Sequence, residues 1–487
     1  MTPDFPDWSG SFTNQIQRLR ATTGPTLHQF ELLFKAWILP WRLAQQDEGE
    51  HSRDRCWNLR LTFWTFLWQV AQAGASCREA IRQAQALCRA QGHCPPPDEN
   101  SPYCQARASL PRQRLQEIHD AVVREADAAV ATRDLWCGRR VKTVDGCTVT
   151  APDTAANQKR YPQQSVQKPG CGYPILRIVA LLSLATGLIT AWAVGAWRES
   201  EMGLLLGQLW DDLQAGDVLL ADRGFCNWGL LALCLQRNVD AVFRVKGARR
   251  RDFRAGKRIS RDERLVQWTK PKQPARTIPA AQWAALPEIL TLRLVRCRLE
   301  IKGFRTQKVV LVTTLLDSVN FPPAALSHLY YRRWAMELTL RNIKITLQMD
   351  HLSCKTPENL DREIRFHFLA HNLVRRLMLE AARRHHVPLE RVSFAGSLAT
   401  ARRFSEALLQ ANNQTCRRQL EVELFRLLAD DLVPDRPGRR EPRAVKRRPK
   451  PYPRLMRHRH KFREIQHQNR YYANSVFGPK YRKSSKR

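Results

Sequence analysis

Two aspartates in the chain have the surroundings of metal-binding carboxylates. Asp145 in KTVDG and Asp222 in VLLADRG each lie at or near the end of an apolar run, with a glycine within two residues. A carboxylate at the carboxyl end of a strand is stiffly held and faces the crevice where ligands bind. Two of them on neighbouring strands could share a divalent cation through oxygen ligands. The alternative for either aspartate alone is that it starts a turn, as Asp before Gly often does.

A third acid, Glu337, lies in a stretch that we predict to be a long helix starting at Pro322. Tyr330, Arg333, Glu337 and Lys344 fall at offsets of 0, 3, 7 and 14 residues, which places them within a stripe about 60° wide on an α-helix. A buried core face would be apolar, whereas this stripe places a carboxylate among groups that bind phosphates. The alternative is a solvated face in which Arg333 and Glu337 form a routine i,i+4 pair.

These motifs resemble those of the DDE transposases of the insertion-sequence-4 type. The resemblance rests on TVDGCTV around Asp145, LLADRGF around Asp222 and the spacing Tyr330-x2-Arg333-x3-Glu337-x6-Lys344. The segments PDTAANQ, LAHNLVRRL, SCREA and SPYCQARASL are also similar to that family, so the resemblance covers most of residues 55–400. Four residues at fixed spacing, with two Asp-Gly strands in the right order, are far more specific than one short motif.

The resemblance implies a ribonuclease-H-like catalytic core with a β insertion before the glutamate, for which the 115 residues between Asp222 and Glu337 leave room. It implies hydrolysis at the ends of an insertion element, then attack of the freed 3′-hydroxyl on target DNA, in some members through a DNA hairpin. It also implies a homodimer that holds two double-stranded DNA ends together.

Two-metal chemistry requires no protein nucleophile, because two Mg²⁺ ions activate the attacking oxygen and stabilise the leaving one. We therefore expect two Mg²⁺ ions, for which Mn²⁺ can substitute, with Asp145 bridging both, Asp222 binding one and Glu337 the other. Tyr330, Arg333 and Lys344 are expected to bind phosphates near the cut, with Arg333 giving a bidentate grip.

Several other side chains could belong to such a site or to the core. If a hairpin forms, a base leaves the stack, and Trp268 and Trp283 are candidates to stack on it, although each could equally be a core residue. We expect Trp334 to be a packing residue. His367 and His371 have the i,i+4 spacing of metal ligands but lack the HExxH glutamate, so we expect an ordinary helix surface there.

The charge of the chain favours a polyanionic partner. Lys and Arg number 80 and Asp and Glu 45, giving a formal charge of +35. Neutralised phosphates release counterions, so nucleic acid fits best, ahead of an anionic membrane or a merely basic protein. Thirteen scattered cysteines without CxxC pairs and the absence of a secretory signal favour a reducing cytoplasm. With the family resemblance, we expect a bacterial protein associated with the nucleoid. Cys88, His93, Cys94 and Cys104 lie close in sequence but match no standard zinc spacing.

The apolar patterns predict an α/β fold: a mixed sheet with flanking helices, interrupted by a β-rich insertion and preceded by an all-helical N-terminal domain. The uncharged run 178–197 is long enough to span a membrane, but Thr186-Gly187 near its middle favours two buried strands joined by a turn. The strands expected are 141–149, 175–185, 188–197, 217–222, 239–245 and 309–314, and the helices expected in the core are 201–213 and 228–237.

The predicted division of the chain follows these patterns and its charge runs. Residues 244–272 hold twelve Lys or Arg against three acids, and 436–463 hold thirteen against one. The predicted units are a helical DNA-binding domain (1–135), the first part of the catalytic core (136–245), a basic β-rich insertion (246–308), the second part of the core (309–400), a C-terminal helical segment (401–434) and a basic, disordered tail (435–487).

Three other functions remain open at this point. A two-metal nuclease or resolvase of the same fold would cleave DNA without joining it. A non-catalytic DNA-binding protein would keep the fold but would not depend on the three acids. A membrane protein would use residues 178–197 as a span.

Overall fold

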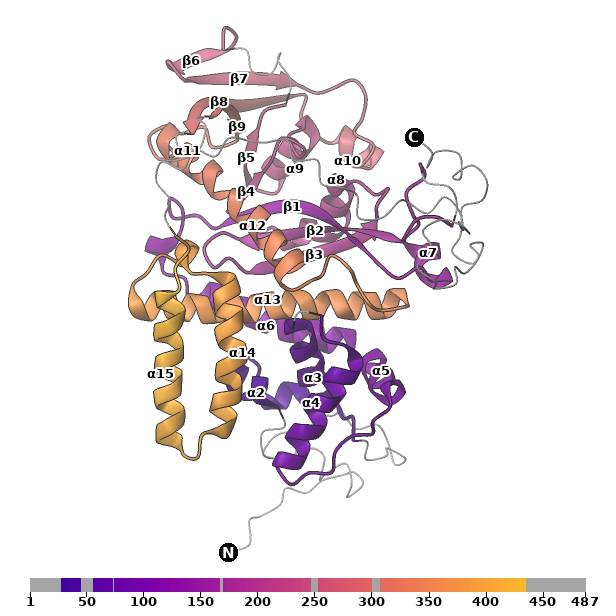
Figure 1. The fold of residues 1–487 in the computed structure, drawn as a ribbon. Helices are drawn as coiled ribbons and strands as arrows, with labels where there is room; N and C mark the ends of the chain where they lie inside the picture. Colours follow the sequence, from indigo (N-terminus) through magenta and orange to yellow (C-terminus); the bar gives the residue numbers. More distant parts are fainter. Residues whose placement is uncertain are drawn as a thin grey trace, which may run out of the picture.

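The computed structural model describes residues 28–44, 56–72, 74–166, 170–246, 253–299 and 307–434. Its centre is one nine-stranded mixed sheet in the order β3-β2-β1-β4-β5-β9-β8-β7-β6 (Figure 1). The tail expected to be disordered, 435–487, lies outside the described residues.

Five strands from residues 141–244 make up one half of the sheet. The strands β1 (Val141–Thr150), β2 (Ile175–Ser183) and β3 (Ile189–Ala196) pair antiparallel in sequence order. The strands β4 (Val218–Ala221) and β5 (Asp240–Arg244) then add in parallel beside β1. All five were predicted from their apolar runs to within two residues at each end.

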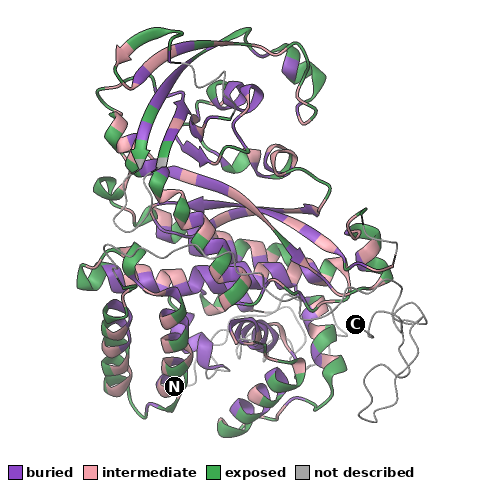
Figure 2. Ribbon diagram, turned by 45° about the horizontal axis from the view of Figure 1, so that its top comes forward, coloured by how far each residue is buried: buried purple, intermediate pink, exposed green. Residues whose placement is uncertain are grey.

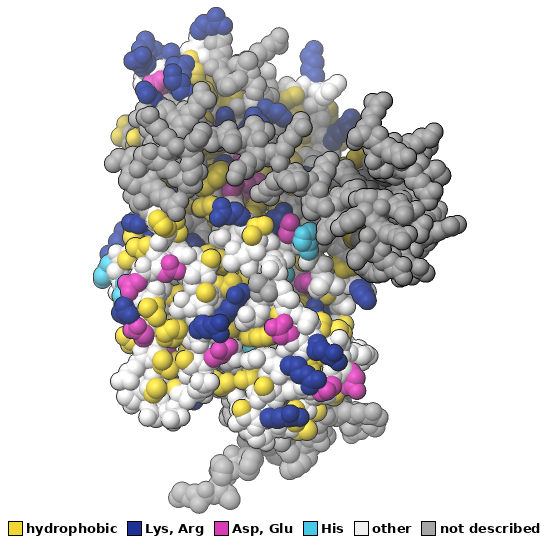
Figure 3. All heavy atoms as spheres, viewed as in Figure 1, with side chains coloured by type: hydrophobic (Ala, Val, Ile, Leu, Met, Phe, Trp, Pro, Cys, Tyr) yellow, Lys and Arg dark blue, Asp and Glu magenta, His cyan; other side chains and the backbone are white. Residues whose placement is uncertain are grey.

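Four further strands extend the same sheet beyond β5. Strand β9 (Gln307–Thr313) pairs antiparallel with β5, and β8 (Ile289–Leu299), β7 (Glu263–Thr269) and β6 (Lys257–Ser260) follow outward. The region predicted to be β-rich is therefore built onto the edge of the central sheet. Lys and Arg side chains gather at the outer end of this extension (Figure 3), and its exposed cations include Lys257, Arg258, Arg261, Arg296, Arg298 and Lys308.

Helices cover both faces of the sheet. One face packs against α8 (Glu201–Leu204) with the π-helical turn η3 (Leu205–Leu209), α9 (Trp228–Gln236) and α10 (Ala280–Ala284). The other face packs against α11 (Pro323–Arg332), α12 (Trp334–Arg341) and the long α13 (Pro357–His385). This second face is the one that carries the candidate site.

The helices before residue 130 share one hydrophobic core with the C-terminal helices. That core joins α2 (Gln29–Phe34), α3 (Leu59–Ala71) and their neighbours to α13, α14 (Phe394–Gln410) and α15 (Gln414–Asp430). Figure 2 shows α13 buried between the sheet and these helices. The boundary expected between residues 400 and 401 falls inside α14. The other helices here are α4 (Cys77–Ala90), α5 (Asn100–Ser109) and α6 (Arg112–Ala128).

The remaining short elements are α7 (Ala155–Arg160), the π-helical turn η6 (Asn342–Thr346) and the 3₁₀ turns η1 (Pro40–Leu43), η2 (Thr132–Asp134), η4 (Trp210–Asp212) and η7 (Leu389–Arg391). The capping predicted at the start of α4 is present, since the Ser76 hydroxyl accepts the Glu79 N–H at 3.1 Å.

The uncharged run 178–197 forms strands, as expected. It supplies most of β2 and all of β3, joined by a turn in which Gly187 has φ = +71°, a backbone conformation that favours glycine. Within the described part of the chain, no helix combines the length and the apolar character needed to cross a membrane.

The prediction for His367 and His371 was wrong. Both side chains lie inside α13's packed faces, with exposed fractions of 6% and 0%. Burial lowers the pKa of both imidazoles, to about 4 for His367 and about 3 for His371, because it disfavours the charged form. His371 instead contacts Asn372, whose side-chain amide bonds the backbone of Ile189 in β3 at 2.8 and 2.9 Å.

Candidate active site

The sheet register brings Asp145 and Asp222 side by side. The parallel ladder of β1 and β4 pairs Thr143 with Leu220, so its continuation by two residues places Asp145 opposite Asp222. Paired residues on adjacent parallel strands point to the same face, about 5 Å apart. Both aspartates therefore face the helices α11 and α12, and the nearby Asp222 raises the pKa of Asp145.

Asp145 is a half-buried carboxylate in the middle of the sheet. Burial raises its pKa to about 6, and the neighbouring Asp222 and Glu201 act in the same direction. The Gly146 N–H, which donates to Asp145 Oδ1 at 2.8 Å, and the Arg333 guanidinium oppose this rise. An acid with this balance would bind a proton or a cation more readily than an ordinary surface aspartate would.

Asp222 also starts a tight turn, which was the alternative explanation for an aspartate close to a glycine. Its Oδ1 accepts the backbone N–H of Gly224 at 2.6 Å, which closes a tight turn directly after β4. The turn and the site are compatible, because the hydrogen bond fixes the carboxylate at the carboxyl end of the strand.

Glu337 lies on α12, which packs against β1, and its observed partner is Arg333. Arg333 Nη2 donates to Glu337 Oε1 at 2.6 Å, which is the i,i+4 pair expected on a helix. Arg333 also acts electrostatically on Asp145, so one guanidinium links the helix carboxylate to the sheet.

Across the described ranges, no three His, Cys, Asp or Glu side chains are grouped closely enough to hold a metal ion.

Tyr330 and Arg333 begin the predicted stripe, and their side chains are more buried than those of Glu337 and Lys344. The Arg333 guanidinium lies 5.7 Å from the centre of the Tyr330 ring, which is 6% exposed. Arg333 Nε is buried without a hydrogen-bond partner in the described structure, so this guanidinium still has a donor to offer. Burial raises the pKa of the Tyr330 phenol, which therefore stays protonated at neutral pH.

Lys344 is separated from the rest of the stripe by a change in helix geometry. The expected continuous α-helix is interrupted at Arg333 and becomes the π-helical turn η6 after Arg341. A π-turn has more residues per turn than an α-helix, so the face of Lys344 shifts. Its ammonium pairs with Asp350 at 2.8 Å and acts electrostatically on Cys147, two residues beyond Asp145 on β1.

Arg244 belongs to the same row and was missed by the sequence analysis. The β4–β5 ladder pairs Ala221 with Phe243, so the next position pairs Asp222 with Arg244. Arg244 acts electrostatically on Tyr330, which agrees with this placement. Three adjacent strands thus present Asp145, Asp222 and Arg244 in one row. Arg244 ends an apolar strand and starts a basic run, a signal that alone does not distinguish it from other cations nearby.

The tryptophans differ in exposure. Trp283 is 7% exposed and packs against Trp228 with ring centres 5.5 Å apart, and Trp268 lies against the same core. Trp334 was expected to be packed, but it is 51% exposed. It follows Arg333 directly in the sequence, and about half of its side chain is open to solvent.

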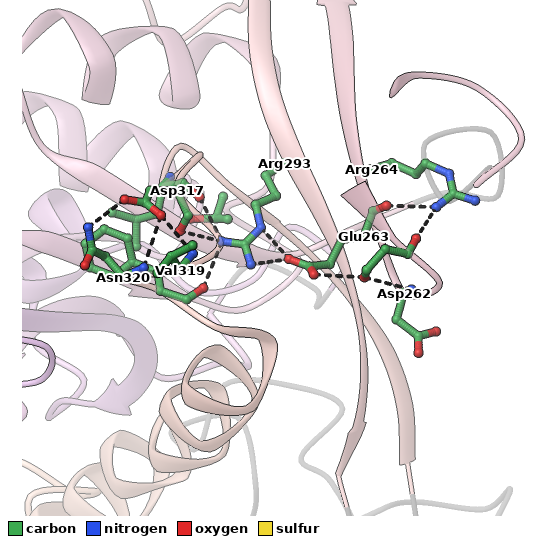
Figure 4. Close-up of polar contacts among 11 residues, drawn as sticks. Asp262, Glu263, Arg264, Arg293, Asp317, Val319 and Asn320 are labelled. Carbon is green, nitrogen blue, oxygen red and sulfur yellow. Dashed lines mark hydrogen bonds and ion pairs between the residues drawn. The ribbon is translucent and has the colours of Figure 1, made fainter. Parts of the chain in front are cut away.

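A buried ion pair between strands β7 and β8 holds in place the loop that leads into α11. The fully buried Arg293 on β8 donates to Glu263 on β7 through Nε at 2.9 Å and also through Nη2. Its Nη1 donates to the carbonyls of Leu315, Asp317 and Phe321 at 3.3, 3.1 and 2.9 Å (Figure 4). This network fastens the loop before α11 to the sheet, and so it fixes where Tyr330 and the following helix lie.

Comparison with known proteins matches this arrangement to one family. A model of the transposase DDE domain matches residues 136–373, which contain Asp145, Asp222 and Glu337. The chain is also 31% identical over 332 residues to the transposase InsG of insertion sequence element IS4 from Escherichia coli (strain K12), covering 65% of this chain and 70% of that protein. The chain belongs to the DDE transposases of the insertion-sequence-4 type. The resemblance drawn from its motifs is therefore confirmed, and the chain is a transposase enzyme with a mixed α/β fold.

Proposed function

We propose that this DDE transposase cuts DNA at the ends of its element and joins the freed 3′-hydroxyls to target DNA, with Asp145, Asp222 and Glu337 as the metal-binding acids. The observation that carries the proposal is the row formed by Asp145 and Asp222 beneath the helix of Glu337. The order of strands β3-β2-β1-β4-β5 and the helices on both faces are consistent with a ribonuclease-H-like core, with β6–β8 in its insertion and β9 at the return to the core.

The donor set suits a pair of Mg²⁺ ions, for which Mn²⁺ could substitute. Carboxylate oxygens are the ligands that these ions prefer. The raised pKa of Asp145 indicates a buried carboxylate that a nearby positive charge would stabilise. Bound divalent ions would supply that charge, activate the attacking water or hydroxyl and stabilise the leaving oxygen. Glu337 would join the aspartates by exchanging its present partner, Arg333.

Arg333 would then be released towards DNA. A guanidinium freed from Glu337, with Nε already unpartnered among the described residues, can grip a phosphate through two N–H groups. Tyr330 would orient it from below, while Arg244 and Lys344 would contact phosphates on either side. These roles extend the predicted phosphate-binding set by one residue, Arg244.

Trp334 is the better candidate for base stacking, ahead of Trp268 and Trp283. A ring that stacks on an unpaired base must be open to solvent before DNA binds, and Trp334 is 51% exposed whereas Trp283 is 7% exposed. The exposed cations of β6–β9 would hold the flanking duplex. Two ends must be held together for the reaction, so we propose that the active form is a homodimer, acting on DNA in the bacterial nucleoid.

The test uses the purified full-length chain, labelled duplexes that carry the element ends, and a supercoiled target plasmid with Mg²⁺. The expected products are cut ends and plasmid joined to labelled ends, and Asp145→Asn is expected to give neither. Cut ends without joined plasmid would favour a two-metal nuclease or resolvase of the same fold. Unchanged processing by Asp145→Asn would show that these acids are not catalytic.

A further inference from the structure

A buried guanidinium in the N-terminal helices is surrounded by thiols. Arg107 on α5 is 7% exposed, and its guanidinium lies 3.8 Å from the centre of the Phe66 ring. Arg107 Nη1 donates to Cys77 Sγ at 3.4 Å, and Nη2 donates to Cys354 Sγ at 3.2 Å. A buried cation is costly unless anions neutralise it. The buried Glu363 carboxylate acts electrostatically on Arg107, and one of these sulfurs is a candidate for a second anion.

Three donors converge on the sulfur of Cys77. Besides Arg107, the Gln69 side-chain Nε2 donates to it at 3.7 Å, and the Cys104 thiol hydrogen-bonds to it. The Gln69 amide is oriented for this role, because its Oε1 accepts the Tyr103 hydroxyl at 2.9 Å. Cys77 is also the first residue of the 14-residue helix α4, where the helix dipole favours a negative charge.

Cys354 is not the anion, because the carboxylate of Glu363 faces it. Its thiol hydrogen-bonds to Glu363, and burial together with that carboxylate raises the pKa of Cys354 well above the usual range. The Cys104 hydrogen bond, with Arg107 and Gln69, lowers the pKa of Cys77 to about 5 against the opposing effect of burial. The same hydrogen bond raises the pKa of Cys104, which keeps that thiol protonated.

We infer that Cys77 is a reactive thiolate and that Cys77 and Cys104 form a reversible disulfide, which makes this pair an oxidation site separate from the DNA-processing centre. Thiolates beside an arginine and a helix N-terminus react readily with peroxides and disulfides, provided that they are accessible. Cys77 is partly exposed and Cys104 is exposed, so a small oxidant can reach the pair.

The reaction balances with hydrogen peroxide as the oxidant. The Cys77 thiolate attacks one peroxide oxygen, the O–O bond breaks, and Cys77 sulfenic acid and hydroxide form. The Cys104 thiol then attacks the sulfenic sulfur, the S–O bond breaks, and the thiol proton leaves with the sulfenic oxygen, so that a disulfide and water form. The two sulfurs lose two electrons in all, and the peroxide is reduced to one water and one hydroxide ion, which takes a proton from the solvent.

Oxidation would remove the thiolate that accepts an Arg107 N–H and would leave the Glu363 carboxylate as the anion that acts on this guanidinium. That guanidinium connects α5 to Cys354, which lies four residues after Asp350, the partner of Lys344. The disulfide would therefore weaken the contact between the N-terminal helices and the segment that leads from η6 into α13. Oxidation of the Cys77–Cys104 pair would thereby affect the segment that positions Lys344, a residue proposed above to contact phosphate.

The first test measures the rate at which iodoacetamide alkylates Cys77 between pH 6 and 8, by peptide mass spectrometry of the intact full-length chain. The expected rate is nearly constant over this range, because the folded thiol is already ionised. The control is the same thiol in the urea-unfolded chain, whose rate should rise about tenfold per pH unit. A tenfold rise per unit in the folded chain as well would overturn the inference.

The second test treats the folded chain with hydrogen peroxide and maps cross-links without reduction. A Cys77–Cys104 disulfide that dithiothreitol reverses is expected, and Cys104→Ser should instead leave a sulfenic acid on Cys77 that dimedone captures. Arg107→Gln should restore the pH dependence of alkylation, whereas the matched control Arg107→Lys should keep most of the flat profile. Absence of both the disulfide and the dimedone adduct would overturn the inference, whatever the variants do.

Discussion

Asp145 and Glu263 are both acids held within the same sheet, but their partners differ. Glu263 accepts hydrogen bonds from the fully buried Arg293 and from the Ser260 hydroxyl. The cation that acts electrostatically on Asp145, Arg333, is hydrogen-bonded to Glu337 instead, and Asp145 lies beside a second aspartate. A paired buried charge stabilises its own surroundings, whereas a crowded acid is available for a ligand. Glu263 therefore stabilises the fold, whereas Asp145 has the surroundings that its proposed catalytic role requires.

The largest expected effect is the loss of DNA processing in Asp145→Asn. Removal of a metal-binding carboxylate should reduce end cleavage by roughly 10³-fold or more, because the bound ions contribute several kcal/mol to the transition state. The free energy of unfolding should stay equal to or rise above that of the wild type. Gel assays measure end cleavage, and urea unfolding of the same preparation measures stability. A large loss of stability would show that Asp145 has a structural role like that of Glu263.

Glu263→Gln should show the opposite pattern. It leaves the Arg293 guanidinium buried beside a neutral amide, which should lower the free energy of unfolding by about 3–5 kcal/mol. Cleavage per folded molecule should change little. The matched control replaces both partners by Met, which should restore much of the stability. If Glu263→Gln were as stable as the wild type, the contrast between the two acids would fail.

The same contrast extends to the tryptophans. Trp334→Ala should leave stability nearly unchanged but weaken the binding of DNA with an unpaired base near the cut by about 1–3 kcal/mol. Trp283→Ala should lower the free energy of unfolding by about 3–5 kcal/mol because it empties part of the core beside Trp228. Fluorescence anisotropy with paired and unpaired duplexes, beside urea unfolding, measures both. Equal effects of the two variants on stability would contradict the assignment.

The smallest expected effect is a pH dependence that belongs to Asp145. Its pKa of about 6 lies above its usual value, so the metal-free folded state holds this proton more tightly than the unfolded state does. The resulting stabilisation is complete below about pH 4 and is lost as pH rises through about 6. Mg²⁺ binding requires the ionised acid, so its affinity should fall about tenfold per pH unit below 6. Calorimetry of the wild type and Asp145→Asn tests this, because the variant should lack this contribution.

The sequence predicted the elements well where local pattern determines them. The apolar runs around Asp145 and Asp222 became β1 and β4, and the turn at Gly187 divided the long uncharged run into two strands. The row of Asp145, Asp222 and Arg244 was less accessible. Strand register depends on pairing between distant segments, and so Arg244 could not be separated from the cations that follow it.

Helix faces and burial were harder to predict for a physical reason. The stripe from Tyr330 to Lys344 assumed ideal α-helical geometry, which the π-turn η6 does not follow. His367 and Trp334 were assigned the wrong exposure because residue type gives only a weak indication of burial at one position. Which helices cover α13 depends on contacts with segments 300 residues away in the chain, and no local pattern reports those.

The shared core around α13 has a consequence for shortened gene copies of the element. Because α3, α5, α6, α14 and α15 pack on the same long helix, a product that lacked residues 57–128 would leave an apolar side of α13 facing water. Such a fragment would self-associate or be degraded before it could compete with intact protein for the element ends. Internal deletions in this stretch are therefore expected to silence a copy outright and to yield no dominant inhibitor.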